Sequence, residues 1–416
     1  METLRMVDPE VADAIEEEGN QQDMTIELNA ATNLCSRAVL EAQGNLFACK
    51  TLEGYPGSRY HGGHGRVDVI EKLAVERAKK LFGAEHANVQ PHSGVSANLA
   101  VYFAILNPGD AILGMDLAMG GHLSHGHKGT FSGKFLTASS YAVERESGRI
   151  DYGEVACRAR KKKPKMIVCG GSAYPRIIDF AQFRTIADDV GAFLMADIAH
   201  VAGLVAGGVY PSPVPYADFV TFTTYKTLRG SRGGTILCKK AYAGKLDKAV
   251  FPGVQGSMHV HMMAGKAVTF KLAASRSFRV YAQQVVENAR ALAKALAERN
   301  YRIVTGGTDT HIVLLDLMER ELTGAEAQKR LEEAGIICNK NAVPFDSRGP
   351  ESTSGVRLGT ASVTTRGFGE SEMVVLAKMI DTVLDKGAEK KQVLQVRESV
   401  RELCRRFPIN CESALP

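Results

Sequence analysis

The sequence lacks any long apolar run and any strong excess of one charge. No stretch reaches the roughly 18 apolar residues that a membrane-spanning helix needs, and the acidic residues 1–22 lack the apolar core of a signal peptide. We therefore expect a soluble, cytoplasmic protein with no membrane partner. The net charge of +5 over 416 residues is too small to indicate a nucleic-acid partner, and the basic run at 158–165 is typical of a solvated helix end.

The sequence also lacks paired cysteines. Its eight cysteines are scattered without the spacing of a metal-binding motif, and Cys169 and Cys238 lie in apolar segments, where cysteine behaves as a small hydrophobic residue. We find no low-complexity tract and no internal repeat. A content of 45% hydrophobic and 23% charged residues is that of an ordinary globular chain. The sequence therefore predicts a reduced protein that is long enough for two or three domains.

Short apolar segments alternate with helix patterns through the middle of the chain. The predicted strands are residues 111–117, 166–169, 193–197, 219–224 and 235–239. A helix is predicted over 67–82, because its apolar residues share one face and Gly83 follows it. This alternation predicts an α/β fold with a mostly parallel sheet and helices on both faces.

The pattern changes after residue 275. A long helix is predicted over 278–299, then a strand at 311–317 and further helices that end near residue 386. This succession indicates a second, smaller α+β domain. The predicted organisation is an N-terminal arm at 1–45, a large domain at 46–275 and a small C-terminal domain at 276–416.

One lysine follows a buried strand in the segment ADFVTFTTYKTLRGSRGG, residues 217–234. Open α/β sheets bind ligands at the carboxyl ends of their strands. Burial there would lower the pKa of Lys226 towards that of a nucleophilic amine, although a lone lysine more often reaches into solvent. The preceding strand, in AFLMADIAH, ends in Asp197, and a buried carboxylate needs a cationic or hydrogen-bonding partner. A lysine for the aldehyde and a carboxylate for the ring nitrogen suit pyridoxal 5'-phosphate.

Two loops could complete such a site. Ser93 and Gly94 precede a helix pattern and could hold a phosphate, although a simple helix cap gives the same pattern. His122 follows a strand and could lie flat on an aromatic cofactor. The spacing of His122, His125 and His127 also permits a metal-dependent aldolase or hydrolase, but no acidic residue close in sequence completes a ligand set. We assign no metal site.

Two charged residues have simpler explanations when each is taken alone. Arg357, in TSGVRLGT, offers a bidentate fork for a carboxylate, yet a lone arginine more often forms a structural salt bridge. Glu53, in LEGYPGSRY, lies in a loop rich in glycine and tyrosine. Desolvation there would raise the pKa of Glu53 into the range useful for acid/base catalysis, but a solvated loop glutamate is the commoner case.

Together these motifs resemble one family. The lysine segment and the runs EGYPGSRYHGG, GAEHANVQPHSG, AMGGHLSHG, FPGVQG, GGTDTHIVLLDL, CNKNAVP and SGVRLGT closely resemble serine hydroxymethyltransferase, in unbroken order over nearly the whole chain. The resemblance implies a fold-type I, aminotransferase-like pyridoxal-phosphate enzyme. It also implies a homodimer or a dimer of dimers with active sites at the subunit interface. The implied partners are small molecules, an amino acid and tetrahydrofolate.

The resemblance further implies roles for single residues. Lys226 would be the Schiff-base lysine, Asp197 the partner of the ring nitrogen and His122 the imidazole stacked on the ring. The other cofactor contacts would come from Ser93, Gly94, Ser172 and His200.

For the substrates, the resemblance makes Arg357 the group that binds the amino-acid carboxylate. Glu53 would be the acid/base between the substrate hydroxyl and folate. The pterin would be lined by Tyr60, Leu117, Gly121, Leu123 and Asn341.

Several positions depart from the usual family pattern. The usual Ala-Ser-Glu-Asn reads Ala30-Ala31-Thr32-Asn33, which removes a serine hydroxyl that helps to hold the substrate carboxylate. Further departures are Thr51, His61, Val95, Tyr225 and the run GVQGSM at 253–258. We expect hydroxymethyl transfer between tetrahydrofolate and L-serine, or an α-substituted analogue such as 2-methylserine, which would give alanine. The alternative is a folate-independent threonine-type aldolase or transaldolase on the same scaffold.

Overall fold

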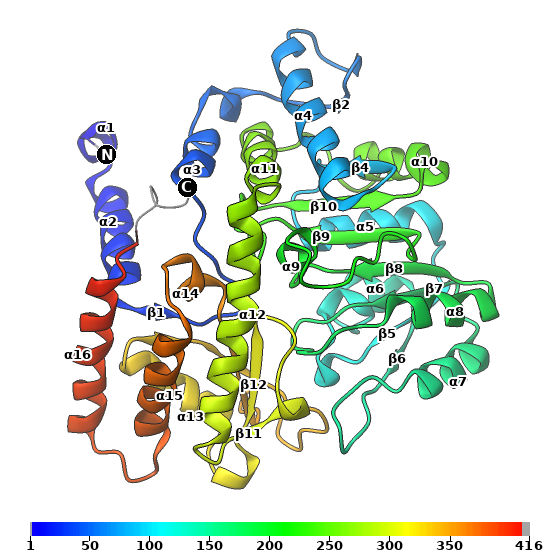
Figure 1. The fold of residues 1–416 in the computed structure, drawn as a ribbon. Coiled ribbons are helices and arrows are strands. Elements are labelled where there is room, and N and C mark those ends of the chain that lie inside the picture. The colour runs from blue at the N-terminus through cyan, green and yellow to red at the C-terminus, as the bar shows by residue number, and fades with distance from the viewer. Residues whose placement is uncertain (1, 410–416) are drawn as a thin grey trace.

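A seven-stranded sheet forms the centre of the larger part of the molecule in the computed structural model, which describes residues 2–409 (Figure 1). Cys411 and the last residues of the predicted small domain lie outside the described residues. The strand order is β4 (His86–Asn88), β10 (Gly234–Cys238), β9 (Phe219–Thr223), β8 (Phe193–Asp197), β7 (Met166–Cys169), β5 (Ala111–Met115) and β6 (Thr137–Tyr141). Neighbouring strands are parallel from β9 through β8, β7 and β5 to β6. Strand β10 is antiparallel to both of its neighbours, β9 and β4. The mostly parallel α/β fold predicted from the sequence is confirmed.

The central strands are buried on both faces, so their alternate residues pack into two different cores. In β7, Met166 and Val168 join one core, while Ile167 and Cys169 join the other. Helices α5 (Gly94–Ile105) and α10 (Ala243–Lys248) cover the first core. The second core is covered by α4 (Gly65–Phe82), α7 (Tyr152–Lys162), α8 (Phe180–Val190) and α11 (Val260–Ala273). The sheet is therefore the middle layer of three.

Helix α4 confirms the helix predicted over 67–82, and Gly83 ends it with φ of 70°, a left-handed conformation that favours glycine. The loop before α4 contains a 3-10 turn (Leu46–Cys49) and a hairpin of β2 (Gly54–Tyr55) and β3 (Ser58–Arg59). Arg59 fixes this hairpin to α4 through ion pairs with Asp68 (2.9 Å) and Glu71 (2.5 Å).

A second sheet has its own core beside the first. Its antiparallel strands are β11 (Arg302–Ile303), β12 (Ile312–Asp316), β15 (Gly355–Gly359) and β14 (Asn339–Asn341). The helices around it are α13 (Gly324–Glu333), α15 (Glu370–Leu384) and α16 (Lys390–Arg406). The prediction that the helices end near residue 386 is wrong, because α16 buries Val396, Val400, Leu403 and Cys404 at helical spacing. Helix α12 (Arg276–Ala297) spans the two parts, with its first half in the large core and its second half in the small one.

The N-terminal segment runs across both parts. Its elements are α1 (Glu2–Val7), α2 (Pro9–Met24), β1 (Ile26–Glu27) and α3 (Arg37–Gln43). Strand β1 pairs in parallel with β13 (Ile336–Ile337) of the small part, and α3 packs on α11 of the large part. The remaining short helices are α6 (Phe131–Phe135), α9 (Ala202–Ala206) and α14 (Ala361–Thr365). None of the helices between residues 2 and 409 is both long and apolar enough to cross a membrane.

Candidate active site

A cavity of about 90 Å³ lies where β7, β8 and β9 end, at their carboxyl ends. This is where open α/β sheets bind ligands. All the residues predicted to contact the cofactor line it: Ser93, Gly94, His122, Ser172, Asp197, His200 and Lys226. Its other lining residues are Val95, His125, Gly171, Ala199, Thr223 and Tyr225. The fold thus brings together side chains that the sequence holds far apart.

Lys226 lies just beyond β9 and is only 8% exposed. Its pKa is lowered to about 8, chiefly by burial. The carboxylate of Asp197 raises this pKa, while the positive charges of Arg357 and Arg232 lower it. Among residues 2–409 no group forms a hydrogen bond or an ion pair with its Nζ. The predicted lowering of the Lys226 pKa by burial is confirmed, and its role as a nucleophile stays a prediction.

Asp197 ends β8 and is held on both carboxylate oxygens. Oδ2 accepts hydrogen bonds from Asn98 Nδ2 (2.8 Å) and His125 Nε2 (3.0 Å), and Oδ1 accepts one from the Ala199 N–H (3.0 Å). Burial by itself would raise the pKa of Asp197. The donors and the neighbouring imidazoles outweigh burial and hold that pKa well below its usual range, so the group is a carboxylate at neutral pH.

Ser93 and Gly94 form the start of α5. The Ser93 hydroxyl accepts a hydrogen bond from the Ser96 N–H (3.1 Å), so the simple helix cap considered for this motif is present. Gly94 lies against Thr223, and a Cβ at position 94 would be 2.8 Å from Thr223 Cγ2. Position 94 therefore excludes a side chain and leaves its backbone at the cavity. The N-terminus of a helix favours an anion such as a phosphate there.

His122 and His200 are neutral imidazoles on the cavity wall. Burial lowers the pKa of His122 to about 4, although the charge of Asp197 opposes this shift. Burial also lowers the pKa of His200 well below its ordinary value, and the charges of Lys226 and Arg357 add to the shift. The His200 ring stacks on His311 with centroids 5.6 Å apart. Neutral rings can lie against an aromatic cofactor without desolvating a charge.

Arg357 reaches the same region from β15 of the second sheet. Its Nη1 donates to the Ser172 carbonyl (2.6 Å) and its Nε donates to Asn339 Oδ1 (3.1 Å). Burial lowers the pKa of Arg357 to about 10, which leaves the guanidinium charged at neutral pH. The salt bridge considered for this residue is absent, because no acidic side chain among the described residues pairs with it. A buried, unpaired guanidinium is suited to bind a carboxylate.

The predicted folate residues do not line this cavity. Glu53 and Tyr60 flank the β2–β3 hairpin, where Glu53 lies 3.3 Å from His61 Nε2 and the Tyr60 ring packs on Phe251. The Glu53 side chain is 33% exposed, so this chain alone does not provide the desolvation expected from the sequence.

The other folate residues are dispersed around the site. Leu117 and Leu123 are 42% and 46% exposed on the loop that carries His122. Gly121 packs on the backbone, since a Cβ there would be 2.2 Å from the Met115 carbonyl oxygen. Asn341 lies in β14, and its Nδ2 donates to the Ala342 carbonyl. Their roles stay predictions.

The histidines proposed as alternative metal ligands do not gather as a set. His127 is exposed, and its Nδ1 accepts a hydrogen bond from Gly129 N–H. Instead, His122 and His125 each offer one nitrogen within 4.8 Å of an Asp197 oxygen. The distant carboxylate thus completes a possible ligand set, but hydrogen bonds to His125 and Asn98 already occupy its Oδ2.

Asn98 and His125 were missed as supporting residues. The Asn98 amide donates to Asp197 and to Ser124 Oγ (2.9 Å), and its oxygen accepts from Thr221 Oγ1 (2.6 Å). A buried asparagine within the apolar face of α5 was the available signal, because such a group needs partners.

Comparison with models of protein families agrees with these observations. The model described as "Serine hydroxymethyltransferase" matches residues 4–380 of the 416 residues. The match includes both sheets and every lining residue of the cavity.

Proposed function

The chain belongs to the serine hydroxymethyltransferase family, and on that basis we propose the amino-acid substrate and the roles of its residues. Members of this family are pyridoxal-phosphate-dependent transferases of one-carbon groups that use tetrahydrofolate as co-substrate. The proposed reaction moves a hydroxymethyl carbon between tetrahydrofolate and a serine-type amino acid. The observation that carries this proposal is a buried Lys226, with its pKa lowered to about 8, in one cavity with an ionised Asp197.

The residues of the cavity fit pyridoxal phosphate. Lys226 is a buried amine held by no other described group, which suits bonding to the aldehyde. The N-terminus of α5 at Ser93 and Gly94 suits the phosphate, and the Asp197 carboxylate suits a protonated ring nitrogen. When bound, the cofactor supplies an electron sink for cleavage of a bond at the substrate's α-carbon.

The surrounding polar groups would orient the ring. His122 would lie against one face of it, because its imidazole is neutral and lines the cavity. His200 would donate from its free ring nitrogen to the phenolic oxygen, and Ser172 would lie beside the ring. In this assignment Asn98 and His125 keep Asp197 ionised and fixed in position.

Arg357 would bind the substrate carboxylate and so decide which bond of the α-carbon faces the electron sink. Two of its N–H groups are already fixed by Ser172 and Asn339, which orients the guanidinium plane and leaves further donors for the substrate. Glu53 would then move the proton that accompanies carbon transfer to or from folate. Tyr60, Leu117, Gly121, Leu123 and Asn341 would line the pterin.

Because Glu53 and Tyr60 lie outside the cavity of their own chain, we propose that they act in the cavity of a partner subunit. Each active site would then use the β2–β3 hairpin of one chain and Lys226 of the other. A homodimer is the smallest assembly that meets this requirement.

An α-substituted serine is the variant substrate that we favour. The segment that carries Ala30 and Ala31 packs directly on β15, two residues from Arg357, and a Cβ at Gly359 would be 2.4 Å from Ala30 Cα. Ala31 offers a methyl group where the family usually has a hydroxyl. This loss removes a polar contact from the region of the substrate carboxylate and makes it more tolerant of an added methyl on the α-carbon.

The test is a substrate comparison with the purified enzyme. L-Serine and 2-methylserine would be supplied with and without tetrahydrofolate, and glycine, alanine and methylenetetrahydrofolate would be measured. We expect folate-dependent turnover, with a larger kcat/KM for 2-methylserine. Equal turnover of threonine-type substrates without folate would instead establish the aldolase alternative.

Replacement of Lys226 by Ala provides the matched variant. Turnover should fall at least about 1,000-fold, because the nucleophilic amine is removed, and the visible absorbance of the bound cofactor should change. A Lys226→Ala enzyme that keeps both would show that another lysine carries the cofactor.

A further inference from the structure

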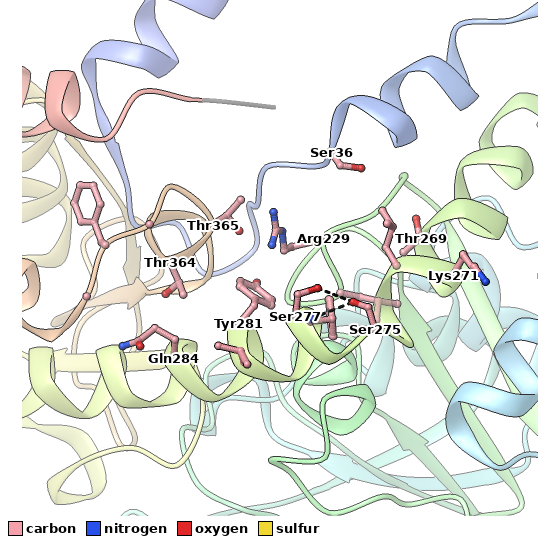
Figure 2. A pocket seen from close by; sticks show the side chains of 17 residues that line it. Ser36, Arg229, Thr269, Lys271, Ser275, Ser277, Tyr281, Gln284, Thr364 and Thr365 are labelled. Carbon is pink, nitrogen blue, oxygen red and sulfur yellow. Dashed lines mark hydrogen bonds between the residues drawn. The ribbon is translucent and has the colours of Figure 1, made fainter. Parts of the chain in front are cut away.

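A second and larger cavity, of about 640 Å³, lies behind the turn that follows Lys226. We call it the Arg229 cavity. Figure 2 shows Arg229 in its middle, with Thr365 on one side and Thr269 on the other; below it lie Tyr281 and Ser277 of α12 and Ser275, which precedes α12. The cavity is separate from the 90 Å³ cavity, since the two share no lining residue. Its volume is in the range of small-molecule binding sites.

The charge of the Arg229 cavity has one sign. Its described lining residues include Arg229 and Lys271 but no aspartate or glutamate. The Arg229 guanidinium lies 4.7 Å over the Tyr281 ring, and no described residue accepts a hydrogen bond from it. Burial lowers the pKa of Arg229, yet an arginine stays charged at neutral pH. Five N–H donors with no acceptor among the described residues favour a negatively charged partner at this half-buried place.

Hydroxyl groups and apolar side chains complete the lining. Ser275 caps the 22-residue helix α12 and lies 2.8 Å from the Ser277 hydroxyl, so the positive end of a long helix also faces the cavity. Hydroxyls of Ser36, Thr269, Thr364 and Thr365 line other sides. The apolar walls are Leu228, Leu272, Phe278, Val280 and Phe368. The three threonine hydroxyls already donate to the Gly265 carbonyl, the Thr360 carbonyl and Asn33 Oδ1, so a ligand's charge would be met by Arg229, with an apolar surface around it.

We propose that the Arg229 cavity binds a small organic anion, a carboxylate or phosphate attached to an apolar body. The anion would form a bidentate pair with the Arg229 guanidinium, and its body would cover the apolar walls. A bare inorganic anion would pair with the guanidinium but would leave the apolar walls in contact with water.

The occupant would act on the catalytic lysine through short connections. Asn33 Nδ2 donates to the Lys226 carbonyl (2.8 Å) and to the Tyr281 hydroxyl (2.8 Å). The Tyr281 hydroxyl donates to the Thr227 carbonyl (3.3 Å), and Thr365 Oγ1 donates to Asn33 Oδ1 (2.8 Å). Arg229 itself donates from its backbone N–H to the Lys226 carbonyl (3.0 Å). The turn that carries Lys226 is thus held by Tyr281, which lines the cavity, and by Asn33, which is bonded to the lining residues Tyr281 and Thr365.

The experiment measures the binding of phenyl phosphate and of benzoate to the holoenzyme by calorimetry, with neutral benzyl alcohol as the comparison. Holoenzyme is used because its bound cofactor keeps the probes out of the phosphate position at α5. We expect saturable binding of one or both anions, one per chain, and none of benzyl alcohol. Occupancy should also shift the visible absorbance of the bound cofactor.

Two variants locate the binding. Asparagine tolerates the left-handed backbone at position 229 (φ 58°), and Arg229→Asn should weaken binding of the anions at least about tenfold. Ser277→Glu keeps Arg229 but supplies a competing carboxylate, and should weaken binding of the anions to a similar extent. Arg279→Gln, on the exposed side of α12, should leave the binding of the anions unchanged.

The proposal is overturned if the wild type binds neither anion, as when a partner subunit closes the cavity. It is equally overturned if both variants bind like the wild type, which would assign the anions to Arg357.

Discussion

At the residue scale, the active-site cavity is defined by charges that are buried but not neutralised by one another. Lys226 and Arg357 are buried cations without an acidic ion-pair partner in the described chain, and Asp197 is a buried carboxylate held by neutral donors and imidazoles. Isolated buried charges are costly, so a fold keeps them where a ligand supplies the missing partner. In the proposed assignment these partners are the cofactor aldehyde for Lys226, the protonated ring nitrogen for Asp197 and the substrate carboxylate for Arg357.

The lowered pKa of Lys226 makes cofactor uptake depend on pH. Only the neutral amine attacks an aldehyde, and its fraction rises about tenfold per pH unit below a pKa of about 8 and then levels off. The rate at which cofactor-free enzyme binds pyridoxal phosphate should therefore rise with pH and reach a plateau above about 8. Stopped-flow absorbance between pH 6 and 9.5, roughly 2 units below and 1.5 above that pKa, measures it.

A neighbouring charge provides the control for this pH dependence. Arg357 lowers the pKa of Lys226, so Arg357→Met should move the midpoint of uptake to higher pH and slow uptake at neutral pH. Arg401→Met, at a distant ion pair on α16, should not move it. An unchanged midpoint in Arg357→Met would mean that the guanidinium does not act on the amine.

The sequence predicts Lys226 and Asp197 as site residues at strand ends, because each lies at the end of its own run of buried residues. Asn98 and His125 could not be recognised in the same way. They reach Asp197 only after α5 and the loop behind β5 have packed on the sheet, so no local pattern reports the contact. Glu53 is a different case, since its own chain does not bring it to the cavity.

At the scale of elements, the apolar parallel strands were predictable and the edges were not. Strand β6 reads TASSY and is largely exposed on its first residues, while β4 has only three residues. Edge strands need little apolar surface, so their sequences carry a weak signal. The antiparallel direction of β10 was equally hidden, because a fully buried strand reads the same in either direction. The β2–β3 hairpin was visible only as a loop rich in glycine and tyrosine.

The hairpin depends on one buried ion pair, which gives a test of stability. The side chains of Arg59 and Glu71 are 6% and 2% exposed, and Glu71 also accepts from Gln90 Nε2 (2.8 Å). Arg59→Met leaves the Glu71 carboxylate buried without its cation, which costs about 3–5 kcal/mol of unfolding free energy. Urea unfolding monitored by circular dichroism measures the loss.

An exposed pair in the same molecule is the control for Arg59. Arg160 and Asp189 are 65% and 45% exposed, so Arg160→Met should change the unfolding free energy by less than about 1 kcal/mol. Arg59→Met should also reduce folate-dependent turnover, because it releases the hairpin that carries Glu53. Equal effects of the two substitutions on stability would contradict a special role for the buried pair.

At the scale of the whole molecule, the two sheets and the N-terminal segment meet around the turn that carries Lys226. Arg357 comes from the second sheet, Asn33 from the N-terminal segment, and Tyr281 from the helix that spans both parts. The predicted regions 1–45, 46–275 and 276–416 therefore describe the order of the chain, and we propose that they function as one unit around that turn. Of the residues proposed to act in catalysis, Glu53 does not lie at this turn in its own chain.

Mixed assemblies of two inactive variants decide whether Glu53 is supplied by a second copy. Lys226→Ala removes the amine, and Glu53→Gln removes the proposed acid/base while leaving the ion pairs of Arg59 with Asp68 and Glu71 intact. If each site combines the hairpin of one chain with the lysine of the other, a mixed dimer has one site with both natural residues and one with neither. With random pairing, co-expressed chains should recover about a quarter of the wild-type folate-dependent activity, since about half of the dimers are mixed and each has one working site.

The same experiment distinguishes the opposite arrangement. If Glu53 served the cavity of its own chain, every site in a mixed dimer would lack one natural residue, and co-expression would recover nothing. Different affinity tags on the two variants allow the mixed dimers to be purified, and these should then show about half of the wild-type turnover per dimer. Mixing the separately purified variants without subunit exchange is the control, and it should stay inactive. Recovery in the co-expressed sample alone therefore requires that the two chains share an active site.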